Sequence, residues 1–226
     1  MSNPAEAPAP RRLARLGVRA VALAALGLGI WFVLEVRRAL PPPAPQVGSA
    51  ATLLPVPKAL PEFRLVDDGG EPFARERLAG RWSFLFFGYA HCPSICPMTL
   101  GIMRDMHREL SAGDPAYGDT QYVFVSVDPE RDAPDALRRY VRHFDPGFVG
   151  ATGDREELGR LTRELGVFHQ RTPGGSVEQY DFDHTASLLL IDPEAQLRAV
   201  FSPPIDPLEA ADAFRAIRRL AGEARS

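Results

Sequence analysis

The chain has 226 residues, a formal charge of −3 and a hydrophobic content of 45%. This length and composition suit one domain with a substantial core plus appendages, and the near balance of charge gives no indication of nucleic-acid binding. Only two cysteines are present, Cys92 and Cys96. Two cysteines cannot build a disulfide framework or a four-thiolate iron–sulfur cluster.

The first 60 residues are predicted to form a tail, a membrane segment and a linker. Residues 1–15 lack a periodic pattern, which predicts a disordered cytoplasmic tail. Residues 16–36 include the uncharged run Ala20–Leu34 and could just cross a bilayer as a helix. More arginines precede this run than follow it, so the positive-inside rule predicts a signal anchor that leaves the rest of the chain outside the cytoplasm. A cleaved signal peptide is the alternative. Residues 37–60 hold six prolines and predict an extended linker.

Residues 61–226 alternate between strand-like and helix-like patterns. The predicted elements, in chain order, are a hairpin over 61–81, a buried strand over 84–87, a helix starting near 96, a strand over 122–127, a helix over 133–144, a strand over 148–151, a helix over 154–165, a hairpin over 185–201 and a helix over 207–221. This alternation predicts an α/β fold with a mixed sheet covered by helices on both faces.

The cysteines lie in the turn between the predicted strand over 84–87 and the helix that follows it. Each cysteine precedes a proline, and Pro97 suits the first turn of a helix. Both sulfurs then lie near a helix N-terminus, which favours anionic sulfur. The spacing allows two thiolates to bind one metal ion, and a Cys92–Cys96 disulfide requires a distorted first turn. A pair of buried cysteines acting as small hydrophobic residues is the third interpretation.

Other residues with metal-binding or polar side chains have simpler interpretations. Met98, Met103 and Met106 recur at helical spacing, which favours core packing over a thioether path for a metal ion. Asp128 supports a ligand histidine, gates access to the site or starts the turn before Pro129, and these alternatives stay open. The remaining candidates are interpreted as local or surface groups: Arg131 and Asp132 as turn and cap residues, His91 as pointing away from the cysteines, His107 and His143 as packing or surface residues, and His169 without an assigned role.

Four segments together resemble the Sco/SenC copper proteins, which have a thioredoxin-like fold. They are GYAHCPSICP (88–97), VSVDPERD (125–132), FDHTAS (182–187) and LIDP (190–193). The resemblance implies that Cys92, Cys96 and His184 bind copper. It also implies a role in assembling the dinuclear copper centre in subunit II of cytochrome c oxidase. The departures from the family pattern surround these ligands without replacing them: Ala90, Ser94, Leu189 and Ala195.

The donor set agrees with the metal that the resemblance implies. Two thiolates and an imidazole suit Cu(I), while Cu(II) and zinc are the alternatives. The implied partners are oxidase subunit II, other copper chaperones and the bacterial inner membrane, with the main domain in the periplasm. Two other functions remain open: a thiol–disulfide reductase acting on the cysteines of that subunit, and a redox or copper sensor. A peroxidase is disfavoured, because Tyr89 occupies the position of the threonine expected three residues before a peroxidatic cysteine.

Overall fold

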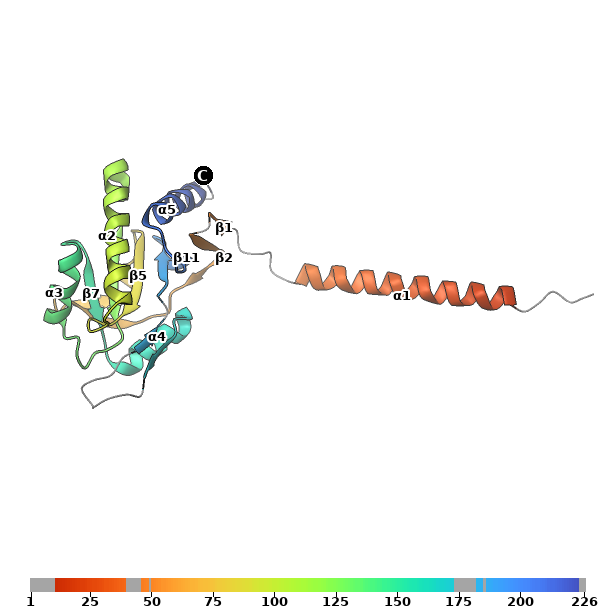
Figure 1. Cartoon of the computed structure of the whole chain (residues 1–226), viewed down its shortest axis with the longest axis horizontal. Coiled ribbons are helices and arrows are strands. Elements are labelled where there is room, and N and C mark those ends of the chain that lie inside the picture. Colours follow the sequence, from red (N-terminus) through yellow and green to blue (C-terminus); the bar gives the residue numbers. More distant parts are fainter. Residues whose placement is uncertain (1–10, 40–45, 49, 173–181, 185, 224–226) are drawn as a thin grey trace, which may run out of the picture. The chain divides into compact units, whose positions relative to one another are not determined.

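The computed structural model describes residues 11–39, 46–48, 50–172, 182–184 and 186–223 (Figure 1). The chain divides into two compact units, Met1–Pro43 and Ala44–Ser226. The first unit contains helix α1 (Arg11–Ala39). The helix starts inside the predicted tail, because the residues from Arg11 to Arg15 are good helix formers; residues 1–10 lie outside the described part.

No helix in the described part of the chain combines the length and the apolar content that crossing a membrane requires. The anchor predicted over 16–36 stays a prediction.

The second unit is built on a nine-stranded mixed sheet, as the alternating pattern predicted. Its strand order is β1-β2-β11-β10-β5-β6-β7-β3-β4. β5, β6 and β7 are mutually parallel, and every other neighbouring pair is antiparallel. The strands are β1 (Gln46–Val47), β2 (Ala51–Ala59), β3 (Arg64–Asp67), β4 (Pro72–Ala74), β5 (Ser83–Gly88), β6 (Gln121–Ser126), β7 (Val149–Thr152), β10 (Leu188–Ile191) and β11 (Gln196–Phe201).

Helices cover both faces of this sheet. α2 (Ile95–Gly113), α3 (Pro134–Phe144) and α5 (Pro207–Glu223) share one buried cluster with the sheet, and α4 (Arg155–Leu165) shares the other (Figure 1). Successive side chains of a strand point to opposite faces. Phe84 and Phe86 therefore belong to the first cluster and Leu85 and Phe87 to the second, which explains the continuous apolar run before the cysteines.

The predicted linker over 37–60 extends too far along the chain, because β1 and β2 belong to the sheet. β2 pairs with β11 at Thr52, Leu53, Lys58 and Ala59. Pro55 and Pro57 fall between these paired positions, where the missing proline N–H removes no hydrogen bond from the ladder with β11. The proline content predicts a spacer here because composition does not reveal which strand positions are paired.

The methionine prediction is confirmed for two residues and wrong for the third. Met103 and Met106 are fully buried in the core, whereas Met98 is 58% exposed. On α2, the inward-facing residues of the first turns are Cys96 and Leu100. Met98 lies two positions after Cys96, about 200° around the helix, and therefore faces outward.

A small ribbon that the sequence did not predict carries the third proposed ligand. β8 (His169–Arg171) and β9 (Phe182–His184) form a separate two-stranded antiparallel sheet. Each strand has three residues, too few for a recognisable alternation of polar and apolar side chains. The predicted hairpin over 185–201 forms as β10 and β11, starting at Leu188.

Candidate metal and redox centre

The cysteine turn begins where β5 ends, at Gly88. All six residues of β5 are buried between the two core clusters. A Cβ atom at Gly88 would lie 2.6 Å from Cys96 Sγ and 2.9 Å from Phe124 Cε2, far inside normal contact distance. Because Gly88 has no side chain, the Cys96 sulfur can pack directly against the sheet at this position.

Cys92 and Cys96 are both free thiols and occupy different environments. Cys96 is buried in the first turn of α2, while Cys92 is partly exposed just before the helix. The Cys96 backbone N–H donates to Cys92 Sγ at 3.4 Å. Ser94, the N-cap residue, makes no side-chain capping bond, so the Cys92 sulfur fills the acceptor role that a capping oxygen would have.

These environments move the two thiol pKa values in opposite directions. Burial tends to raise the pKa of Cys92, but hydrogen bonds from the backbone of Cys96, Ser94 and Ile95 outweigh it and lower that pKa. Burial raises the pKa of Cys96 strongly, and the nearby charges of Cys92 and Asp132 raise it further. Cys92 is therefore the thiol that ionises first, and Cys96 loses its proton readily only to a bound cation or a bond to sulfur.

The DPERD segment (128–132) contains a residue, Asp132, whose contact with the cysteine turn the sequence does not predict. Asp128 is buried and pairs with Arg131, whose guanidinium carbon lies 5.8 Å from the centre of the Tyr89 ring. That pairing fits the turn role of Asp128, and its support of a histidine ligand stays a prediction. Asp132, predicted to be a local cap, instead reaches the cysteine turn and bonds to Ala90. One feature of the sequence hints at this role of Asp132. Ser126 is a polar residue at the end of the apolar strand β6, and its hydroxyl donates a hydrogen bond to the Asp132 carboxylate.

His184 lies in β9, where its Cα partner across the ribbon is His169. The position of its imidazole lies outside what the structure describes. Among the described side chains, no group of three or more histidine, cysteine, aspartate or glutamate residues could hold a metal ion. The ligand set Cys92, Cys96 and His184, and a disulfide between the cysteines, stay predictions.

His107 and His143 are packing and surface residues, as predicted, and whether His91 points away from the cysteines stays a prediction. His91 is 55% exposed, and its Nδ1 lies 3.2 Å from Asp132 Oδ1. His107 pairs with Asp145 at 3.1 Å and packs against Tyr122. His143 is exposed and contacts Phe144 edge to face.

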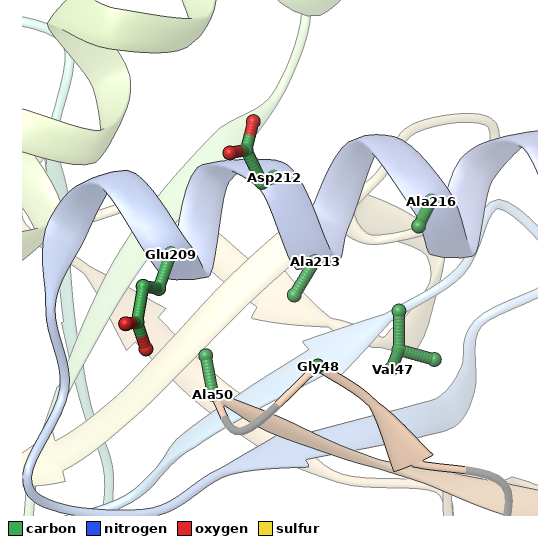
Figure 2. A pocket seen from close by; sticks show the side chains of 7 residues that line it. All are labelled: Val47, Gly48, Ala50, Glu209, Asp212, Ala213 and Ala216. Carbon is green, nitrogen blue, oxygen red and sulfur yellow. The ribbon is translucent and has the colours of Figure 1, made fainter.

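A hollow of about 280 Å³, which neither cysteine lines, lies between α5 and the turn that joins β1 to β2 (Figure 2). Ala213 and Ala216 point toward this turn, while Asp212 points away from it. Its other lining residues are Val47, Gly48, Ala50 and Glu209. Because this lining has no thiol or imidazole, the hollow does not offer the donors that copper requires.

The segment that contains the cysteine turn matches a known protein family. The SCO1/SenC family model matches residues 54–220. The chain belongs to the SCO1/SenC family. A protein of Stutzerimonas stutzeri is 39% identical over 154 residues, which are 68% of this chain and 74% of that protein.

Other SCO1/SenC proteins support the same fold and differ in length. The crystal structure of Arabidopsis thaliana ScoI with copper bound has a TM-score of 0.66 and 30% identity, covering 71% of this chain and 98% of that one. The mitochondrial SCO2 homologue of mouse is 35% identical over 133 residues, or 59% of this chain, and the match spans 52% of its length. The predicted thioredoxin-like sheet with flanking helices is thus confirmed. The SCO1/SenC match begins inside β2, so this strand belongs to the family region.

Proposed function

We propose that the protein is a copper chaperone that binds Cu(I) through Cys92, Cys96 and His184. It delivers the ion to the dinuclear copper centre in subunit II of cytochrome c oxidase during assembly. The partner is proposed from the four family segments in the sequence, and other copper chaperones are the source of the ion.

The observation that carries this proposal is the pair of free thiols at the start of α2. Thiolate sulfur is the ligand type that selects Cu(I), and a partly exposed Cys92 gives an incoming ion its first contact. The buried Cys96, whose pKa is raised by burial, gives up its proton when a cation compensates the thiolate charge. Such a site holds a soft ion and can release it by ligand exchange with another thiolate protein.

The test is a competitive Cu(I) titration of the reduced, full-length protein and its His184→Ala variant. We expect the variant to lose more than the 10–100-fold in affinity that removal of an outer-shell group costs, because a direct ligand is removed. His143→Ala is the matched control, since this histidine lies on the exposed side of α3. Equal affinities of wild type and His184→Ala would contradict the proposed ligand set.

A thiol–disulfide reductase is the second candidate, and the opposite pKa directions of the two thiols favour it. In this reaction Cys92 attacks a target disulfide, and Cys96 then displaces the reduced target. The two thiols give up two electrons and two protons and become a disulfide, while the target disulfide becomes two thiols. His184→Ala separates the candidates, because it should impair copper retention and leave the reduction of a disulfide substrate unchanged.

We further propose that residues 16–36 anchor the protein in the inner membrane with the main domain in the periplasm. The exposed apolar side chains of α1 support this proposal: Leu23, Leu26, Leu28, Ile30, Trp31, Phe32, Val33 and Leu34. The expected result is that a membrane-impermeant maleimide labels Cys92 in intact spheroplasts. Labelling only after lysis would place the domain in the cytoplasm. Cys92→Ser is the control for labelling at other groups.

A further inference from the structure

Asp132 lies in the loop after β6, yet its carboxylate serves the cysteine turn. The residue is completely buried, with 0% of its surface exposed. Its backbone N–H donates to the Asp128 carbonyl at 3.0 Å, which fixes its own loop. We propose that Asp132 is a positioning residue that holds the cysteine turn in its open, dithiol form for copper and thiol chemistry.

Hydrogen-bonding groups from the cysteine turn and from the end of β6 surround this carboxylate. Oδ2 accepts from the Ala90 backbone N–H at 2.8 Å and from Ser126 Oγ at 2.5 Å. Oδ1 lies 3.2 Å from His91 Nδ1. Ala90 and His91 are the two residues immediately before Cys92. The backbone that directs the Cys92 side chain is therefore held by a group about 40 positions away in the sequence.

Backbone hydrogen bonds also join the two segments that the Asp132 carboxylate connects. β5 and β6 are parallel neighbours with Gly88 opposite Ser126, so both loops leave the sheet at the same edge. Just beyond the ladder, the Val127 N–H donates to the Gly88 carbonyl at 2.8 Å. Gly88 packs against the Cys96 sulfur. These contacts therefore fix the backbone that leads to both cysteines.

The charge of Asp132 is also suited to a site that takes up a cation. In the described part of the chain its carboxylate lies 3.2 Å from His91 Nδ1, a contact that is an ion pair only when the imidazole is protonated, while Arg131 pairs with Asp128. A buried carboxylate is costly unless several donors compensate it, and here the surrounding donors do so. A negative charge near the Cys96 sulfur favours a bound cation over a bare thiolate.

The decisive test compares Asp132→Ala with Asp132→Asn in the full-length protein. Alanine removes every acceptor, whereas asparagine keeps one oxygen that can accept from Ala90. The readout is the equilibrium with glutathione, in which the two thiols pass two electrons and two protons to glutathione disulfide. The products are the Cys92–Cys96 disulfide and two molecules of glutathione.

We expect Asp132→Ala to shift this equilibrium at least tenfold toward the Cys92–Cys96 disulfide, because the turn is no longer held open. A tenfold change corresponds to about 30 mV for a two-electron couple. Asp132→Asn should shift the equilibrium in the same direction by a smaller factor, about two to four, because the amide keeps one of the acceptor oxygens. An Asp132→Ala equilibrium within twofold of wild type would overturn the proposal.

Asp192→Ala is the matched control, because Asp192 is also buried and accepts from the backbone of Glu194 and Gln196 at 3.1 and 3.0 Å. It follows Ile191, which pairs with Ser83 at the opposite end of β5 from the cysteine turn. We expect Asp192→Ala to leave the equilibrium within twofold of wild type. An equal shift in both alanine variants would mean that general loosening of the fold is responsible, and would overturn the proposal.

A second pair of variants decides the question if Asp132→Ala does not fold. His91→Ala removes one contact at an exposed position, and Asp132→Asn keeps the size of the side chain. Both should shift the glutathione equilibrium toward the disulfide by a factor of two or more. Wild-type values in both variants would overturn the proposal.

Copper gives an additional readout that rests on the proposed function. Asp132→Ala should weaken Cu(I) binding 10–100-fold, as expected for a group that supports ligands without binding the metal. If the wild-type protein binds no Cu(I), the proposed function fails, and the glutathione equilibrium still decides the role of Asp132. An unchanged affinity in a variant with a shifted equilibrium would overturn the copper part of the role.

Discussion

Gly88→Ala is expected to lower the free energy of unfolding by about 1–3 kcal/mol, the range for overpacking a core. The new methyl group would meet Cys96 Sγ at 2.6 Å and Phe124 Cε2 at 2.9 Å. β5 lies between β10 and β6 and cannot move without disturbing both ladders, so the sulfur must be displaced. Urea denaturation measures the stability, and Cu(I) titration measures the effect on the site.

Gly101→Ala is the matched control for this prediction. Gly101 lies in the middle of α2, and a Cβ atom there would meet no other atom within 4 Å. Alanine favours the helix, so this variant should be up to about 1 kcal/mol more stable than wild type. If Gly88→Ala were as stable as wild type and bound copper normally, the close approach between Gly88 and Cys96 would not be a constraint on the site.

Replacing either cysteine by serine is expected to weaken Cu(I) binding more than 100-fold, because a hydroxyl is a poor ligand for a soft ion. The two variants should differ in stability. Cys96→Ser places a hydroxyl in a fully buried position, which costs about 1–3 kcal/mol if the group finds no partner. Cys92→Ser changes a partly exposed side chain, and its effect should stay within about 0.5 kcal/mol.

Ser94→Ala is the control for the cysteine variants, because this exposed residue in the same turn makes no capping bond. It should change neither stability nor copper affinity. Equal stability losses in Cys92→Ser and Cys96→Ser would contradict the difference in burial. Retention of copper by either variant would mean that one thiolate is sufficient and that the pair does not act as a unit.

The regular elements were predictable because their patterns are local. The apolar run of β5 and the two ends of α4 at Asp154 and Gly166 appear where the sequence predicts them, while the buried stripe of α2 is wrong at Met98. Asp154 Oδ1 accepts from the Glu157 N–H at 2.8 Å, and Gly166 has φ of 71°. Each of these signals depends on residues only a few positions apart.

The features that could not be predicted depend on partners far away in the sequence. β2 becomes a strand because β11 pairs with it, and its prolines are tolerated only where that pairing is interrupted. Asp132 looks like a turn residue until β5 and β6 are known to be neighbours. For the proposed copper site, the cysteine turn followed from local chemistry, whereas His184 entered through the family resemblance alone.

The separation of β8 and β9 from the main sheet has a consequence for the exchange of metal between proteins. The cysteines emerge from a strand with hydrogen-bonded neighbours on both sides, while His184 belongs to a two-stranded ribbon. Displacing this ribbon would break no backbone hydrogen bond of the nine-stranded sheet. If His184 is the third ligand, as proposed, its imidazole could be withdrawn together with this ribbon while Cys92, Cys96 and the nine-stranded sheet keep their places.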